Sequence, residues 1–353
     1  MNLIATRRYS ACMHGVGRLV DRYPTVSPER LIAQLRPPPT FAKVSFATYQ
    51  PDPAEPTQAA AVAACQEFCR RAVERRAGRK KLFGRREVLP GVGLYLDGGF
   101  GVGKTHLLAS AYYQLPDAPP HPKVFATFGE LTQLAGVFGF VECIDLLADY
   151  TAVCIDEFEL DDPGNTTLIS RMLSMLVERG VSVAATSNTL PEQLGEGRFA
   201  AQDFLREINT LARIFTTVRI EGPDYRHRDL PPAPQPLSDE EVAERAAGVP
   251  GATFDDFDAL CAHLATMHPS RYLTLIEGVT AVFLTGVHGI DDQNVALRLV
   301  SLTDRLYDAG IPVVASGAKL DTIFSEEMLA GGYRKKYLRA TSRLLALTSV
   351  TLA

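Results

Sequence analysis

A glycine-rich turn between an apolar run and a helix is the feature that most constrains the fold of this chain. Residues 92–97 have the composition of a short buried strand, residues 98–105 read GGFGVGKT, and a helical pattern begins at Lys104. A strand that turns directly into a helix begins a βαβ unit, whose two strands lie parallel in one sheet. We therefore expect an α/β fold built on a parallel sheet.

The same turn has the spacing G-x-x-x-x-G-K-[ST], and each of its residue types suits a bound phosphate. Glycines let successive backbone N–H groups face a phosphate, which also meets the positive end of the following helix. We expect Lys104 to reach the β- and γ-phosphates and the Thr105 hydroxyl to bind Mg²⁺. The residues expected to bind the nucleotide are Gly98, Gly99, Phe100, Gly101, Val102, Gly103, Lys104, Thr105 and His106, the last having local packing as its alternative role.

Two further apolar runs end in polar residues suited to hydrolysis. Residues 152–155 lead into Asp156 and Glu157, and residues 181–185 lead into a Thr-Ser-Asn step that ends at Asn188. A carboxylate at a strand end beside the phosphate turn can hold Mg²⁺, the role expected of Asp156. Glu157 is expected to act as general base toward a water that Asn188 positions. Alternatively, the two acids form a solvated strand end and Asn188 caps a helix. Together the three signals predict a nucleoside triphosphatase.

Strands and helices alternate along most of the chain. A further strand is expected at 217–220, and helices at 57–76, 166–179 and 200–213, which is typical of βαβ units. Residues 229–238 contain four prolines and predict a linker. We divide the chain into a flexible tail (1–22), with Met13 as a hypothetical start of translation, a helical lead-in (23–84), a P-loop core (85–228), a linker (229–238) and a smaller α/β lid domain (239–353).

The lid domain contains a sequence pattern that is similar to part of the core. Residues 151–187 and 280–317 share one pattern at an offset of 129, which becomes 130 after one inserted residue. The pattern fits either a duplicated βαβ unit or two generic strand–helix–strand units. Thr285, Gly286 and Ala318 stand where the first copy has its two acids and its asparagine. A second copy would therefore have no phosphate chemistry.

The order of the three motifs is that of AAA+ ATPases, and neither N-K-x-D nor an LSGGQ-like element occurs. The chain also resembles the ZapE/Afg-like ATPases over residues 20–348. The segments that carry this resemblance include GLYLDGGFGVGKTHLL, CIDEFELDD, ERGVSVAATSNTLPEQL and EGPDYRHR. The resemblance implies an AAA+ module that hydrolyses ATP as a ring of copies of itself. It also implies a protein partner, which in bacterial members belongs to the division machinery with the tubulin-like FtsZ, and in mitochondrial relatives to protein quality control.

A ring ATPase needs a guanidinium from the neighbouring subunit to neutralise charge on the γ-phosphate. The Gly-Leu-Gln-Arg step of the family is replaced here by GRFAAQ at residues 197–202. We rank Arg206 first for this role and Arg198 second, with surface salt bridges as the alternative for each. Arg213 is the third candidate and ranks below them because it has a helix-end cap as its alternative role, and Arg298 is a candidate sensor within the same chain.

Composition excludes several other classes of protein. No apolar run reaches the roughly 18 residues that a membrane helix needs. Six cysteines without a secretion signal predict reduced thiols in the cytoplasm. The net charge of −5 points to no partner by itself, although residues 70–86 hold nine Lys and Arg against Glu74 alone. This basic segment is either a solvated helix end or a contact for nucleic acid, an anionic membrane or an acidic partner.

Two other functions fit the same motifs. One is a helicase-loader-like AAA+ protein that acts on a nucleic-acid complex, which the basic segment would favour. Nucleic acid is not favoured overall, because only Phe83 interrupts that segment with an aromatic ring for base stacking. The other is a scaffold that ATP merely switches, which would have no use for a base at Glu157.

Overall fold

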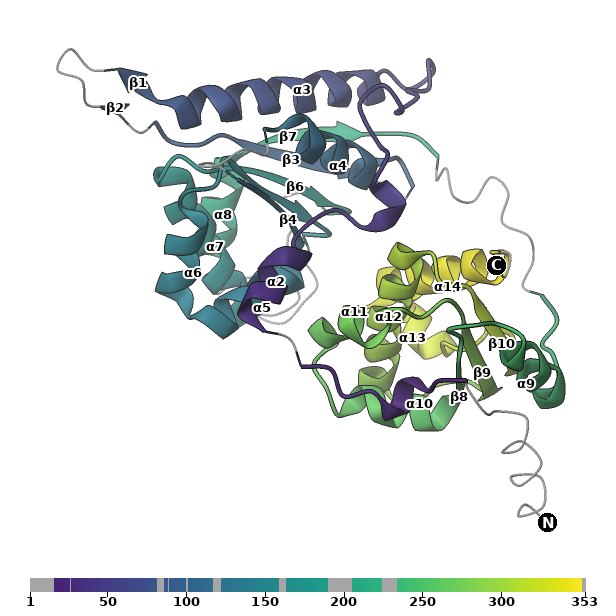
Figure 1. Cartoon of the computed structure of the whole chain (residues 1–353). Coiled ribbons are helices and arrows are strands. Elements are labelled where there is room, and N and C mark those ends of the chain that lie inside the picture. The colour runs from purple at the N-terminus through teal and green to yellow at the C-terminus, as the bar shows by residue number, and fades with distance from the viewer. Residues whose placement is uncertain are drawn as a thin grey trace. The chain divides into compact units, whose positions relative to one another are not determined.

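The computed structural model divides the chain into two compact units (Figure 1). The core unit is Ser27–Arg228, and the C-terminal unit combines Asp229–Ala353 with the segment up to Val26. The residues that the structure describes are 16–25, 27–80, 86–87, 89–99, 101–116, 122–158, 163–189, 205–223 and 234–350.

The core unit is built on the expected parallel sheet, with five strands in the order β4-β5-β6-β3-β7. Strand β6 lies between β3 and β5, so the turn after β3 and the acids after β5 flank the end of β6. The strands are β3 (Gly93–Gly98), β4 (Lys123–Thr127), β5 (Ala152–Asp156), β6 (Ser182–Ser187) and β7 (Phe215–Ile220).

Helices cover both faces of this sheet (Figure 1). Leu94 and Leu96 of β3 join the buried cluster under α3 and α4, whereas Tyr95 between them meets Phe158 and Phe215. This alternation follows from the two-residue period of a strand, and it gives the sheet an apolar layer on each side. The helices of the unit are α2 (Pro28–Gln34), α3 (Pro56–Ala77), α4 (Lys104–Gln114), α5 (Phe128–Phe138), α6 (Phe140–Leu147), α7 (Pro163–Glu178) and α8 (Leu205–Ile214).

The basic segment follows α3 into a short antiparallel pair of strands. Strand β1 (Arg79–Lys80) pairs with β2 (Arg86–Glu87), so that Arg79 lies opposite Glu87. Residues 81–85 between them lie outside the described part. The segment is therefore a helix end and two paired strands in the part described.

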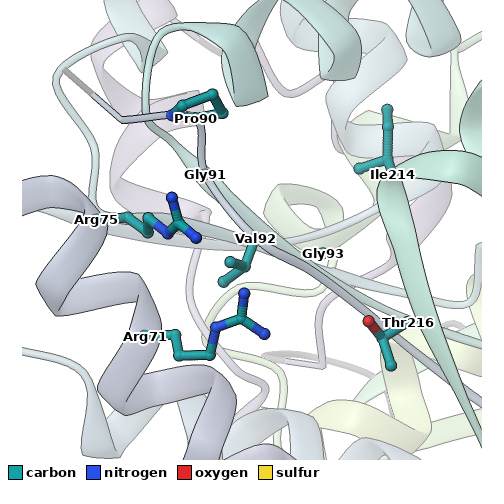
Figure 2. A pocket seen from close by; sticks show the side chains of 8 residues that line it. All are labelled: Arg71, Arg75, Pro90, Gly91, Val92, Gly93, Ile214 and Thr216. Atoms are coloured by element: carbon teal, nitrogen blue, oxygen red, sulfur yellow. The ribbon is translucent and has the colours of Figure 1, made fainter.

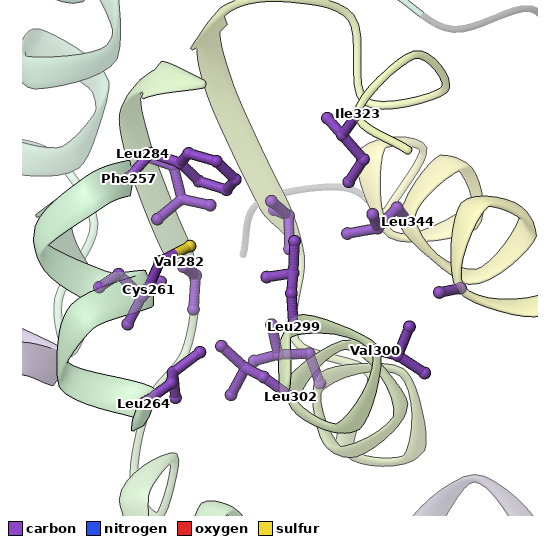
Figure 3. Packing of buried hydrophobic residues seen from close by; sticks show 14 of the residues in the cluster. Phe257, Cys261, Leu264, Val282, Leu284, Leu299, Val300, Leu302, Ile323 and Leu344 are labelled. Atoms are coloured by element: carbon purple, nitrogen blue, oxygen red, sulfur yellow. The ribbon is translucent and has the colours of Figure 1, made fainter. Parts of the chain in front are cut away.

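The C-terminal unit has a three-stranded parallel sheet in the order β10-β9-β8. Figure 3 shows its core, where Leu264 of α10, Val282 of β9, Leu299 of α12 and Leu344 of α14 come together. Its elements are α9 (Asp239–Ala247), β8 (Thr253–Asp256), α10 (Phe257–Ala265), α11 (Tyr272–Leu275), β9 (Val282–Val287), α12 (Gln293–Ala309), β10 (Val313–Gly317), α13 (Glu326–Ala330) and α14 (Arg334–Thr348).

The N-terminal segment is part of this second unit, so a flexible tail over residues 1–22 is wrong for residues 16–22. Gly17 forms a parallel bridge with Thr253, and Leu19 is fully buried in the core. The carboxylate of Asp255 accepts the N–H groups of Leu19 and Val20 at 2.9 and 3.2 Å. These contacts satisfy the backbone of the segment and hold it as an extra edge of the sheet. Residues 1–15 lie outside the described part.

The two units share a βαβ element in detail. Val153 of β5 pairs with Val183 of β6, and the residues at the repeat offsets, Val282 and Val313, pair in the same way between β9 and β10. Thr186 accepts the N–H of Glu157 at 3.1 Å, and Ser316 accepts the N–H of Gly286 at 3.2 Å. Matching register and matching side-chain contacts favour a duplicated unit over two generic ones.

The likeness extends one strand and one helix further toward the N-terminus. Thr127 caps α5 and Asp256 caps α10, again 129 residues apart. Large apolar residues also match at this offset, namely Phe125 with Phe254, Phe128 with Phe257, and Leu131 with Leu260. In the described residues of the C-terminal unit the place of β3 is taken only by a single parallel bridge, between Leu237 and Ser316 of β10, and no full strand stands there.

The cysteines of the described part are all free thiols. Cys65, Cys69, Cys143, Cys154 and Cys261 are buried, and none forms a disulfide. Burial raises the pKa of the Cys69 thiol to about 12, which keeps it protonated and unreactive.

Candidate nucleotide site

Close packing and left-handed backbone both require glycines in the turn after β3. A Cβ atom on Gly98 would lie 2.4 Å from the carbonyl oxygen of Ile220 on β7, so no larger residue fits there. Gly101 and Gly103 have φ values of 67° and 88°, which favour glycine. Helix α4 begins directly afterwards at Lys104, so its free N–H groups face the turn. Phe100 lies outside the described residues.

The ammonium group of Lys104 joins the turn to the end of β6. Its Nζ donates to the carbonyl oxygens of Gly98 and Gly99 at 2.8 and 2.5 Å, and to Oδ1 of Asn188 at 2.8 Å. The structure thus brings together two predicted site residues that are 84 positions apart in the chain. The cation lies over the mouth of the turn, which is the place for an anionic ligand.

Asp156 lies at the centre of a hydroxyl network. Its Oδ1 accepts the hydroxyl of Thr105 at 3.1 Å and that of Thr186 at 2.5 Å, and the residue is 7% exposed. The hydroxyl and carboxylate oxygens of Thr105 and Asp156 are ligands that Mg²⁺ prefers. No three His, Cys, Asp or Glu side chains cluster as a metal cage among the described residues. One carboxylate and one hydroxyl suit Mg²⁺, which usually keeps waters and phosphate oxygens as its other ligands.

Glu157 has a left-handed backbone, with φ of 53°, and no other non-glycine residue in the described part has a positive φ. Thr186 holds this conformation from both sides. Its hydroxyl accepts the N–H of Glu157 at 3.1 Å, and its carbonyl oxygen accepts the N–H of Phe158 at 2.7 Å. The Phe158 ring is fully buried between Tyr95, Phe128 and Phe215. The chain is therefore turned sharply after Asp156, and the half-buried Glu157 is fixed at the turn.

Sequence reasoning missed the part that Thr186 plays. The residue was recognised only as a member of the polar strand end, yet its hydroxyl links Asp156 to the backbone of Glu157. A polar residue that is 2% exposed at the end of an apolar strand was the available signal. Asp97 was missed as well, although it is buried directly before the glycine turn and pairs with Arg219 at 3.3 Å.

His106 faces the lead-in segment. Its Nε2 lies 3.0 Å from the Thr48 hydroxyl and 3.2 Å from the Ser45 carbonyl oxygen, and burial lowers its pKa. The ring of Tyr49 packs edge-on against the His106 ring, with 5.5 Å between the ring centroids. The Tyr49 hydroxyl donates to the carbonyl oxygen of Val102 at 2.8 Å. These contacts agree with the packing role for His106.

The structure locates the predicted arginines only in part. Arg198 lies outside the described residues, and Arg206 lies in the first turn of α8, with its side chain outside the described part. Arg213 is in the last turn of α8, where the helix dipole favours a cation. Arg298 donates to the carbonyl oxygens of Leu264 and Met267 at the end of α10, which is a structural role within the C-terminal unit.

The phosphate turn, its lysine and the acidic strand end define a P-loop nucleoside triphosphatase. Comparison with known proteins narrows this class. The model of the AFG1-like ATPase family matches residues 25–353, and the chain belongs to that family of ATPases.

Several curated proteins are similar to this chain. The Escherichia coli K12 protein named Cell division protein ZapE is 27% identical over 311 residues, covering 76% of this chain and 82% of that protein. The zebrafish (Danio rerio) protein Lactation elevated protein 1 homolog B is 24% identical over 308 residues, covering 69% and 59% respectively.

Among solved structures, domain III of the Thermotoga maritima replication initiation protein DnaA is 19% identical, with a TM-score of 0.38. The match covers 60% of this chain and 85% of that one. None of the described helices is both long and apolar enough to cross a membrane.

Proposed function

We propose that the chain hydrolyses ATP to ADP and phosphate in a Mg²⁺-dependent reaction at the turn after β3. Membership of the ATPase family supports the activity. The observation that carries the proposed site is the hydrogen-bonded group in which Asp156 joins Thr105 to Thr186, next to the contact between Lys104 and Asn188. Residues 98–106 would surround the phosphates, with His106 fixing the lead-in against the loop.

The chain's own residues then divide the work. Lys104 exchanges the carbonyl oxygens of the turn for β- and γ-phosphate oxygens, and Thr105 and Asp156 are the residues that would hold Mg²⁺. When bound, Mg²⁺ neutralises charge on the phosphate oxygens. Asn188 orients a water in line with the γ-phosphorus, and Glu157 takes its proton as the new P–O bond forms and the bond to the bridging oxygen breaks. Arg206, or else Arg198, of a neighbouring copy stabilises the charge that develops.

The proposed role of ATP turnover in the cell is supported by similarity to named relatives. We propose that copies of the chain assemble into a ring in the cytoplasm and couple ATP turnover to the remodelling of a protein partner in cell division. The name of the Escherichia coli relative supports the division role. FtsZ or another division protein is the proposed target.

ATP turnover at several protein concentrations tests this proposal. Wild type should turn over repeatedly with Mg²⁺, and the rate per chain should rise with concentration because a neighbour completes the site. Glu157→Gln should lower the rate by about 100-fold or more while nucleotide binding persists. Glu67→Gln, an exposed carboxylate on α3, is the control and should match wild type. Equal rates in Glu157→Gln and wild type would overturn the assigned base.

A further inference from the structure

The basic segment contributes to a pocket at the edge of the sheet opposite the phosphate loop. Parallel strands β3 and β7 begin at this edge and end at the loop, so the two sites lie at opposite strand ends. The pocket has a volume of about 230 Å³ (Figure 2). It is lined by Arg71, Arg75, Pro90, Gly91, Val92, Gly93, Ile214 and Thr216.

Two guanidinium groups enter the pocket from one side. Arg71 and Arg75 are one helical turn apart on α3, and Figure 2 shows both side chains directed at the start of β3. Both are half-buried, and neither forms a hydrogen bond or an ion pair with another described residue. Arg70 on the same helix is paired with Glu67 and Glu74. Among the described residues no carboxylate forms an ion pair with Arg71 or Arg75, although the nearby charge of Glu67 still acts on Arg71.

The described part of the lining offers no negative charge. None of the lining residues that the structure describes is acidic, and the floor is the backbone of residues 90–93. Gly91 and Gly93 are required by the sheet, because a Cβ atom there would lie 2.0 Å from the Val181 carbonyl oxygen or 2.2 Å from that of Ile214. Thr216 adds an exposed hydroxyl opposite the arginines. Two cations and one hydroxyl thus converge on a concave backbone surface.

We propose that this pocket binds the phosphate group of a small phosphorylated ligand. Two guanidinium groups held near each other repel, and an anion between them reverses that repulsion. Phosphate oxygens can accept two N–H hydrogen bonds from an arginine and a hydrogen bond from a hydroxyl group at the same time. The pocket has room for several water-sized groups, which suits a phosphate with a small attached moiety. None of the described lining residues is aromatic, so this part of the pocket offers no stacking platform for the bases of a nucleic-acid strand.

Equilibrium dialysis with labelled orthophosphate tests the proposal, with a non-hydrolysable ATP analogue present to fill the phosphate loop. Wild type should bind one phosphate per chain. Arg71→Gln/Arg75→Gln should weaken binding by about tenfold or more, and Thr216→Val by a few-fold. Arg70→Gln/Arg179→Gln removes the same charge from exposed ion pairs and should leave binding unchanged.

The outcomes separate the alternatives. Absence of saturable phosphate binding below about 10 mM, or equal binding by the double variant and wild type, would overturn the proposal. Should the double variant fail to fold, as judged by its thermal transition, unchanged phosphate affinity in Thr216→Val would overturn it instead. A labelled oligonucleotide at physiological salt forms the second arm. Oligonucleotide binding that the double variant loses, without orthophosphate binding by wild type, would assign the pocket to nucleic acid and overturn the small ligand.

Discussion

Glu157 is held in a backbone conformation that side chains other than glycine adopt at a cost. Its φ of 53° is maintained by the two hydrogen bonds to Thr186 and by the buried ring of Phe158. Left-handed backbone costs a residue with a Cβ atom about 1–2 kcal/mol. The position therefore carries strain that a glycine would release.

This strain can be measured with two substitutions that both remove the side chain. Glu157→Gly and Glu157→Ala should both abolish hydrolysis, because neither supplies a base. Glu157→Gly should be more stable to denaturant than Glu157→Ala by about 1 kcal/mol, because only alanine retains the strain. Equal stability of the two variants would show that the backbone relaxes and that the conformation is not imposed by the fold.

Thr186 makes a separate prediction at the same scale. Thr186→Val keeps the shape of the side chain but removes the hydroxyl, so the N–H of Glu157 loses its partner and Asp156 loses one donor. We expect a loss of about 1–3 kcal/mol in stability and at least a tenfold lower kcat. Thr186→Ser restores the hydroxyl and should recover most of the rate, whereas Thr217→Val on the exposed side of β7 should change neither quantity. Failure of serine to rescue would point to packing instead of positioning.

At the scale of elements, apolar runs predicted most strands of the core sheet. The runs that became β3, β5 and β6 were recognised, and so were α3 and α7. Most of β7 was recognised as well, over residues 217–220, although Arg219 interrupts that run. Strand β4 was not, because it begins with Lys123, whose ammonium is buried against the Leu115 carbonyl oxygen at 2.7 Å and the Tyr112 ring. A lysine in a sequence predicts a solvent-exposed position unless the acceptor that bonds its buried ammonium group is known. That acceptor is the carbonyl oxygen of Leu115, the residue that caps the end of α4, and no local pattern shows that it lies beside β4.

The prediction of a flexible tail was wrong for residues 16–22 for a related reason, and this segment allows a third test. Leu19 stands in a short segment with no extended apolar run, between Arg18 and Arg22, yet it is fully buried in the core of the C-terminal unit. Leu19→Ala should lower the free energy of unfolding of that unit by about 2–5 kcal/mol. Leu338→Ala on α14, where the leucine is 40% exposed, is the control and should lose far less. A flexible tail would instead give Leu19→Ala no effect.

At the scale of the whole molecule, the site was more predictable than the organisation. Lys104, Asn188, Thr105 and Asp156 meet as expected, because spacing and parallel strands together bring strand ends to one edge of the sheet. The two units divide between Arg228 and Asp229, which is the first residue of the proline-rich stretch 229–238. No local sequence pattern predicted that residues 16–25 belong to the C-terminal unit. It depends on Asp255, which is 236 positions from the leucine it holds.

The βαβ element that the two units share allows the strained backbone at Glu157 to be compared with the matching position in the C-terminal unit. Gly286 stands at the place of Glu157, with φ of 69° against 53°, and its N–H bonds the equivalent hydroxyl. The architecture thus demands a left-handed residue at the end of this strand in both copies. In the copy without phosphate chemistry that demand is met by glycine, the residue that satisfies it without penalty. Where hydrolysis is proposed, glutamate occupies the position in spite of the penalty. The same chain thus holds, at matching strand ends, one residue that adopts the left-handed backbone without cost and one that adopts it at a cost.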